Sequence, residues 1–142
     1  MAFPPEQQLR VGVDLVEVER LRRLLAEHAD RHEELFTAAE LAYCRGKRRR
    51  NEHLAARFAA KEAVLKAFGT GISQRMRFAE IEVLNEPSGR PRVRLLGAVA
   101  SFAERHGLSQ LDVSLSHTEG TALAHAVSVW AAAPPCPPSN EE

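Results

Sequence analysis

The stretch NEHLAARFAAKEAVLKAFG, residues 51–69, predicts a central helix that runs from about Asn51 to Phe68. At about 100° per residue, four apolar side chains fall on one stripe of this helix: Leu54, Phe58, Leu65 and Phe68. Gly69 is well placed to end the helix, because glycine accepts the left-handed conformation that often follows a helix. We expect the rest of the fold to pack against this helix.

The charged residues of the same helix allow two interpretations. Glu62 and Lys66 are four positions apart and share a face, as in an ordinary surface ion pair. Lys61 is different, because it falls in the middle of the apolar stripe, where a lysine without a partner is costly to bury. The helix alone therefore leaves a structural and a functional role for these residues open.

Shorter patterns on both sides of the helix predict further strands and helices. Alternating apolar residues at 11–16 predict a strand, and a helical stripe follows it. Thr37 and Glu40 have the spacing of a capping box, which starts another helix. Beyond the central helix, strand patterns lie at 78–84, 92–96, 111–117 and 121–130, and a helical pattern lies at 98–105. Turn residues at 87–91 join the first two strands as a hairpin. This order predicts an α+β fold with a mainly antiparallel sheet packed against a long central helix.

The composition is that of one globular domain. A length of 142 residues fits a single domain, and a hydrophobic content of 44 % is enough for a core. The 19 basic and 19 acidic residues give a net charge of zero, which argues against a general nucleic-acid-binding protein. We interpret the basic run from Arg45 to Arg50 as a solvated face, and nucleic-acid binding by this run is the alternative.

Cysteine use and the absence of long apolar runs indicate where the protein works. Cys44 and Cys136 have no metal-type spacing and form no disulfide framework, so a reducing compartment is expected. No apolar run approaches the roughly 20 residues of a membrane helix. Residues 1–8 lack the features of a secretory signal. We expect a cytoplasmic protein with no membrane segment and three parts: a flexible N-terminus at 1–9, one domain at 10–130 and a disordered Pro-rich tail at 131–142.

Asp14 and Glu62 are candidates for a metal site. Asp14 lies near the end of the first strand, close to Gly12, which allows other groups to approach the backbone. Together with Glu62 it would offer two carboxylates, and Mg²⁺ typically takes one or two carboxylates with substrate phosphate and water. The alternative for Asp14 alone is a helix-capping role.

Two other motifs suggest chemistry that their context disfavours. The glycines of Phe68-Gly-Thr-Gly71 follow a helix, whereas a phosphate-binding loop precedes one and uses its positive end. This segment is interpreted first as a helix cap and turn. Ser116 and His117 suggest a hydrolase, but neighbours on a strand face opposite sides and there is no Gly-x-Ser-x-Gly elbow.

Four blocks of the sequence, taken together, resemble the holo-acyl-carrier-protein synthases, small members of the 4′-phosphopantetheinyl transferases. The blocks match in order and spacing over about residues 10 to 130, and the turn at Gly89-Arg-Pro91 also fits. The blocks are Gly12-Val-Asp-Leu-Val-Glu-Val-Glu-Arg20, Phe36-Thr-Ala-Ala-Glu-Leu41, Arg57-Phe-Ala-Ala-Lys-Glu-Ala-Val-Leu-Lys-Ala-Phe-Gly-Thr-Gly71 and Ser114-Leu-Ser-His-Thr118.

The resemblance implies transfer of 4′-phosphopantetheine from coenzyme A to a serine of an acyl carrier protein, with Mg²⁺ required and 3′,5′-ADP released. It implies catalytic roles for Asp14, Glu62 and Lys66. Asp14 and Glu62 would hold Mg²⁺ with the coenzyme A pyrophosphate, and Glu62 would help to take the serine proton. The implied cofactor-binding residues are Arg57, Lys66, Gly69, Gly71, His117 and Thr118.

The resemblance also implies partners. Arg20 corresponds to an arginine that meets the acidic carrier protein, and Lys61 to the lysine of the family's Lys-Glu pair. His32-Glu-Glu34 places acid near the expected docking surface. A carrier from fatty-acid synthesis and one from polyketide synthesis both stay open. A coenzyme A-binding module without activity is the alternative function, although it need not keep both carboxylates.

A homotrimer with active sites between subunits is also implied, because small members of this group build each site from two chains. The strand at 121–130 gives an independent indication. Leu123, Val127 and Val129 lie on one side and three alanines on the other, which suits a strand covered on both faces. Closed cyclic symmetry would bury the second face in each copy.

Overall fold

The computed structural model describes residues 6–73 and 75–131. The elements are β1 (Gln7–Glu17), α1 (Val18–Glu27), α2 (His32–Leu35), α3 (Ala38–Arg45), α4 (Arg50–Phe68), β2 (Ile81–Asn85), β3 (Pro91–Leu95), α5 (Gly97–Arg105), β4 (Leu108–His117) and β5 (Thr121–Ala131). After the first strand come the helices α1 to α4, and two pairs of consecutive strands follow with α5 between them; one-turn 3₁₀ helices lie at 29–31 and 78–80. The α+β class predicted from the sequence is confirmed.

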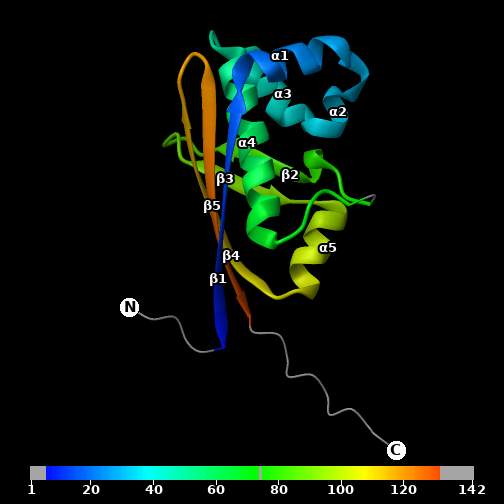
Figure 1. Cartoon of the computed structure of the whole chain (residues 1–142), viewed down its shortest axis with the longest axis vertical. Coiled ribbons are helices and arrows are strands. Elements are labelled where there is room, and N and C mark those ends of the chain that lie inside the picture. The colour runs from blue at the N-terminus through cyan, green and yellow to red at the C-terminus, as the bar shows by residue number, and fades with distance from the viewer. Residues whose placement is uncertain (1–5, 74, 132–142) are drawn as a thin grey trace, which may run out of the picture.

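All strand pairs are antiparallel. β5 lies in the middle of a three-stranded sheet between β1 and β4, and β2 pairs with β3 in a separate hairpin. Figure 1 shows the long strands side by side with α4 running along them. The pairing of Gln7 with Ala131 brings residues 7–9 into β1, so these three residues are not part of a flexible N-terminus. Residues 1–5 and 132–142 lie outside the described residues.

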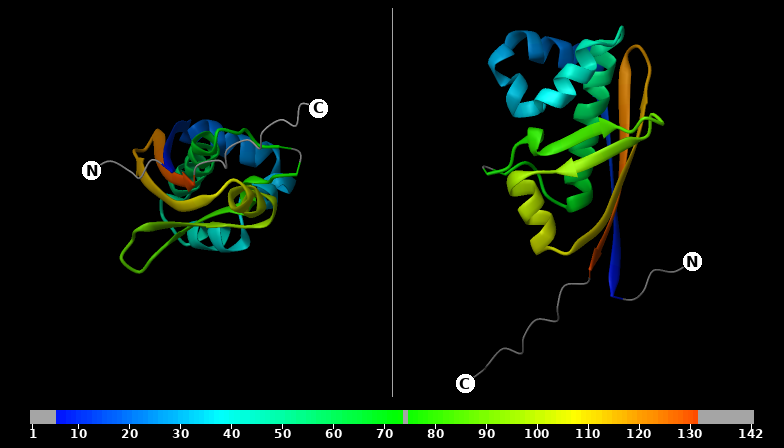
Figure 2. Two further views of the ribbon diagram at one scale, coloured as in Figure 1. Left: turned by 90° about the horizontal axis from the view of Figure 1, so that it is seen from below. Right: turned by 180° about the vertical axis from the view of Figure 1, so that it is seen from behind.

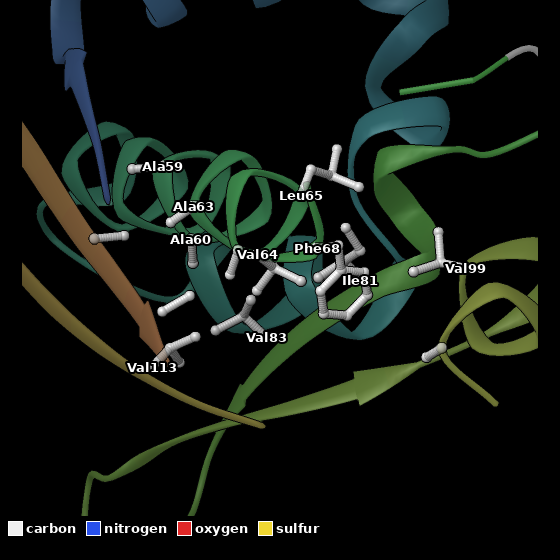
Figure 3. Close-up of a cluster of buried hydrophobic side chains, with 14 of the residues drawn as sticks. Ala59, Ala60, Ala63, Val64, Leu65, Phe68, Ile81, Val83, Val99 and Val113 are labelled. Carbon is white, nitrogen blue, oxygen red and sulfur yellow. The ribbon is translucent and has the colours of Figure 1, made fainter. Parts of the chain in front are cut away.

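Helix α4 is the centre of the core, between the three-stranded sheet and the β2–β3 hairpin. Small and apolar side chains of α4 pack on β5 alanines and on the buried Ile81 and Val83 of β2. Figure 2 shows the hairpin crossing α4 on the side away from β1, and Figure 3 shows the buried side chains. Gly69 ends the helix with φ of 76°, and its N–H bonds to the carbonyls of Leu65 and Lys66. The central helix and its cap are therefore confirmed.

Gly12 allows β1 to lie directly against α4. A Cβ at Gly12 would overlap the carbonyl oxygen of Ala63 and would lie 2.6 Å from the nitrogen of Ala67. Only a residue without a side chain fits there. Because β1 side chains alternate, Asp14 points to the same side as Gly12. The close approach thus brings Asp14 beside the helix.

Lys61, for which the sequence left a structural and a functional role open, has a buried partner in Glu40. Its ammonium is fully buried and donates to Glu40 Oε1 at 2.7 Å, to the Phe78 carbonyl at 3.1 Å and to the Ile81 carbonyl. Burial lowers the pKa of Lys61, and the Glu40 carboxylate opposes this shift. Glu40 also accepts hydrogen bonds from the backbone N–H of Thr37 and of Val83. The pair joins α3, α4 and β2, which is a structural role.

The strand predicted at 78–84 begins later than expected. Residues 78–80 form a 3₁₀ turn, and β2 starts at Ile81. The Glu80 carboxylate accepts from the backbone N–H of Arg77 at 2.7 Å and of Ala98 at 2.8 Å. The bond from Arg77 is local and the bond from Ala98 is tertiary, and together they hold residues 78–80 in the turn instead of the strand.

An exposed apolar patch, mostly from β1, lies on the face of the three-stranded sheet that points away from α4. Its exposed apolar residues, here called the outer face, are Leu9, Val11, Val13, Leu15 and Leu123, with exposed fractions from 40 % to 66 %. The opposite face of β5 carries Ala122, Ala124 and Ala126, which are fully buried. The alternation predicted for β5 is therefore present, with one face covered by α4. No helix within 6–73 or 75–131 has the length and apolar character needed to cross a bilayer.

Candidate active site

Three predicted catalytic residues lie together on one side of α4. Lys66 Nζ donates to Asp14 Oδ1 and to the Val13 carbonyl, both at 3.0 Å. Glu62 lies one turn before Lys66 on the same helix face. The Asp14 side chain is 17 % exposed and that of Lys66 is 55 % exposed, so the group is open to solvent at its cationic end. We call Asp14, Glu62 and Lys66 the carboxylate cluster.

The electrostatics of this cluster fit a divalent cation. Burial raises the pKa of Glu62, the nearby Asp14 carboxylate raises it further, and Lys66 lowers it. Two carboxylates within electrostatic reach of each other favour a positive charge between them. Within 6–73 and 75–131 no group of three or more His, Cys, Asp or Glu is placed to hold a metal. Two carboxylates alone suit Mg²⁺, which keeps water and takes substrate phosphate as further ligands.

Gly69 and Gly71 follow the cluster at the C-terminal end of α4. A Cβ at either position would meet no atom within 4 Å, so both glycines border open space. Gly69 acts as the helix cap that the sequence predicts, and the Thr70 N–H bonds to the Leu65 carbonyl. Any phosphate near these glycines needs cations to attract it, because this end of a helix is negative.

Arg57 lies on the opposite side of α4. Arg57 and Lys66 are nine residues apart, which is a rotation of about 180° on a helix. The Arg57 side chain donates to Asn85 Oδ1 at 2.6 Å and to the His53 carbonyl at 3.4 Å, and its guanidinium lies over the Tyr43 ring at 4.4 Å. It is only 2 % exposed, and its buried Nε has no partner within the described residues. Arg57 is thus held inside the chain and apart from the carboxylate cluster.

His117 and Thr118 lie near Arg57 and far from Lys66. His117 Nδ1 is 3.2 Å from Glu52 Oε1, and its ring packs on that of His53 with centroids 5.4 Å apart. Glu52 and Lys66 are separated by about 21 Å along the helix axis. Thr118 forms the turn between β4 and β5 through hydrogen bonds with Thr121. The structure therefore divides the predicted set: Asp14, Glu62 and Lys66 lie along the C-terminal half of α4, whereas His117 lies at its N-terminal end.

The second group contains residues that the sequence analysis did not select. Glu52, His53 and Asn85 each contact a predicted cofactor residue. Next to Glu52 is a cavity of about 300 Å³ whose lining includes Arg48, Arg49 and Arg50. The basic run interpreted as a solvated face thus borders a hollow. We call His117, Glu52, His53 and these arginines the histidine cluster.

Arg20 is exposed on α1, six residues after Asp14. Its neighbours Arg22 and Arg23 bond to Glu19 at 2.7 Å and 3.4 Å, and the Arg22 hydrogen bond lowers the pKa of Glu19 to about 2. Arg20 makes no side-chain hydrogen bond within the part of the chain described. A groove of about 490 Å³ lies between α1, α2 and residues 72–78, and its apolar lining includes Leu24, Ile72 and Met76.

Residues 10–127 match the 4′-phosphopantetheinyl transferase superfamily. The chain belongs to this superfamily. A holo-[acyl-carrier-protein] synthase of Ruminiclostridium cellulolyticum is 42 % identical over 122 residues, which cover 84 % of this chain and 91 % of that protein. The structure of the Chronobacterium ammoniagenes ACPS–CoA complex is similar with a TM-score of 0.77 and 35 % identity, and covers 87 % of this chain and 98 % of that chain. The Helicobacter pylori holo-[acyl-carrier-protein] synthase in complex with coenzyme A has a TM-score of 0.72 and 26 % identity, and covers 83 % and 98 %.

Proposed function

We propose that this chain is a holo-acyl-carrier-protein synthase that transfers 4′-phosphopantetheine from coenzyme A to a serine of an acyl carrier protein. The observation that carries the proposal is the carboxylate cluster, in which Asp14, Glu62 and Lys66 meet from elements far apart in sequence. Relatives that match over most of their length bear the name of this activity. The free, buried Cys44 supports the expected cytoplasmic setting.

The chemistry proposed for the cluster is a single displacement at phosphorus. The carrier serine oxygen forms a bond to the phosphorus that bears pantetheine, and the bond from that phosphorus to 3′,5′-ADP breaks. Glu62, directly or through a water, helps to take the serine proton. Lys66 moves from Asp14 to the phosphate oxygens and offsets their charge.

Asp14 and Glu62 are the residues that would hold Mg²⁺. Bound there, Mg²⁺ supplies charge neutralisation for the pyrophosphate and for the developing negative charge. Lys66 Nζ lies 3.0 Å from Asp14 Oδ1 and balances its charge. The Lys66 ammonium can therefore leave Asp14 and pair with a substrate phosphate instead.

We propose that the working enzyme is a homotrimer whose active sites lie between subunits. His117 contacts Glu52 at the N-terminal end of α4, about 21 Å along the helix axis from Lys66, so a single chain does not bring His117 to Lys66. A neighbouring copy could present its histidine cluster to the carboxylate cluster. The exposed outer face offers the apolar surface for such an assembly.

The proposed carrier docks on α1. Arg20 is free to meet an acidic partner, since Glu19 occupies Arg22 and Arg23 instead. The apolar groove beside α1 would take apolar side chains of the carrier. Charge would then guide the encounter and the groove would supply contact area.

Mass spectrometry of an apo carrier protein incubated with enzyme, coenzyme A and Mg²⁺ tests the function. We expect the carrier to gain the mass of phosphopantetheine, and the gain to disappear when EDTA removes the metal. A carrier whose target serine is replaced by alanine is the control. An unmodified carrier at high enzyme concentration would contradict the proposal.

A further inference from the structure

Glu52 is a buried carboxylate that the proposed mechanism does not use. Its side chain is 10 % exposed and lies in the first turn of α4. Its Oε1 atom faces His117 Nδ1 at 3.2 Å, and its Oε2 atom faces Arg49 Nε at 3.7 Å. A carboxylate at the start of a helix also interacts well with the helix dipole. The contact with His117, 65 residues away in sequence, is not explained by that local role.

The contact determines which nitrogen of His117 carries a proton. An ionised carboxylate only accepts hydrogen bonds, so Nδ1 must be the donor in this pair. The other ring nitrogen, Nε2, then points away from Glu52 and makes no hydrogen bond within the described residues. In histidine ligands generally, the partner of one nitrogen sets the state and orientation of the other.

The ring is also fixed from its side. His53 packs on His117 with its ring inclined by 60°, and Tyr43 packs on His53 with centroids 6.0 Å apart. Burial lowers the pKa of His53, which keeps that ring neutral near neutral pH. A neutral neighbour does not repel a positively charged His117. The imidazole thus has one polar anchor and one aromatic wall, while its side chain is still 28 % exposed.

We infer that Glu52 is a positioning residue that aims His117 Nε2 at a phosphate group of coenzyme A. The inference rests on the proposed function, in which His117 contacts the cofactor. Glu52 itself would not touch the cofactor, because its carboxylate would repel phosphate. It would act through His117 by fixing the orientation of the ring and by holding the Nδ1 proton on the side away from the cofactor.

Calorimetric titration of coenzyme A into the enzyme tests this inference without requiring transfer. We expect Glu52→Ala to raise the Kd for coenzyme A about tenfold, the size of one lost charge-assisted hydrogen bond. Glu52→Gln keeps an oxygen that accepts from Nδ1, so its effect should be about threefold. In a His117→Ala background, Glu52→Ala should change Kd less than about twofold, because the residue it orients is gone.

Nuclear magnetic resonance of histidine labelled with ¹⁵N gives a readout that a purely structural role would not move. The signal of His117, assigned by its loss in His117→Ala, should show a proton on Nδ1 in the unmodified enzyme. Glu52→Ala should change the protonation pattern of that ring. Glu52→Gln serves the same comparison if the alanine variant fails to fold.

Glu82 offers a matched control. It is buried, 4 % exposed, and forms an ion pair with Arg94 at 3.3 Å away from His117. Glu82→Ala should lower stability while leaving the Kd for coenzyme A unchanged. The inference is overturned if Glu52→Ala binds coenzyme A as tightly as the unmodified enzyme, or if its effect adds fully to that of His117→Ala. If the unmodified enzyme transfers no phosphopantetheine but the Glu52 variants still change the Kd for coenzyme A as expected, the proposed function is contradicted and the role of Glu52 is not.

Discussion

The two sides of α4 differ in what they do with charged residues. On the side of β1, Glu62 and Lys66 are open to solvent and their partner Asp14 comes from a neighbouring strand. On the other side, Arg57 is buried and bonded to Asn85. The exposed Lys66 can exchange Asp14 for another anion, whereas the buried Arg57 keeps its contact with Asn85. Helix α4 thus contributes reactive groups, Glu62 and Lys66, on one side and a supporting group, Arg57, on the other.

The largest expected effect tests the reactive side. Asp14→Asn should lower kcat/KM for transfer roughly 1,000-fold, because the several kcal/mol of charge stabilisation expected from the metal depend on this carboxylate. The fold should persist, since Asp14 lies outside the apolar core clusters. The rate is measured by mass spectrometry over a range of Mg²⁺ concentrations. Near-normal activity at limiting Mg²⁺ would show that Asp14 does not hold the ion.

Mixing two variants extends this prediction to the histidine cluster. Asp14→Asn and His117→Ala damage different clusters, which would lie on different subunits of one site. Co-expressed, the two chains should form intact sites at about one quarter of positions in a cyclic trimer. Each variant assembled alone is the control. No gain of activity on mixing, with subunit exchange verified by mass, would contradict the shared site.

The next effect concerns the surface that would bring the two sides together. Val13→Glu places a charge in the exposed outer face, where Val13 is 53 % exposed. Light scattering should report about three times 15.7 kDa for the unmodified chain and a single chain for the variant. Activity should fall about 100-fold with assembly, since a buried unpaired charge is costly. Ser101→Glu on exposed α5 is the control, and an active monomer would contradict both the trimer and the shared site.

A smaller effect separates carrier docking from both sides of α4. Arg20→Glu should raise the KM for the carrier about tenfold and leave the KM for coenzyme A unchanged. Because salt screens exposed charges, the difference should shrink at high ionic strength. Arg105→Glu on α5 makes the same charge reversal away from α1. An unchanged carrier KM would remove Arg20 from the docking surface.

Local patterns predicted most of the elements correctly. Gly69 and the Thr37 capping box depend only on neighbouring residues, and both are as expected. The start of β2 was predicted three residues too early, because the Glu80 bonds to Ala98 depend on tertiary structure. For the same reason the sequence did not identify Glu40 as the partner of Lys61, 21 residues away.

The candidate site was predicted as one set, but only part of it meets in one chain. For Arg57 the signal is present in the sequence, because nine residues separate it from Lys66 and this spacing corresponds to opposite faces of a helix. Glu52 and His53 carry no such signal. Their partner His117 comes from β4, and that contact exists only once the sheet has packed on α4.

The last and smallest effect is on the free energy of unfolding, which the ionised Glu62 carboxylate lowers. Burial and the Asp14 carboxylate raise the pKa of Glu62, so the folded state holds its proton more tightly than the unfolded state does. Stability from this group is fully present below the unfolded pKa of about 4.3, and it is lost as pH rises through the raised value. At pH 7 the ionised Glu62 therefore weakens the fold.

Glu62→Gln removes that charge and should increase the free energy of unfolding at pH 7 by about 0.5 kcal/mol, a small value because solvent screens the partly exposed site. Chemical denaturation at pH 7 and pH 3 measures the difference, which should become small at pH 3, well below the ordinary glutamate pKa of about 4.3. Lys66→Met is the opposite control, since it removes the cation that stabilises both carboxylates and should weaken the fold at pH 7. A Glu62→Gln variant less stable than the unmodified chain at pH 7 would mean that the carboxylate supports the fold, and the contrast between the two sides of α4 would fail.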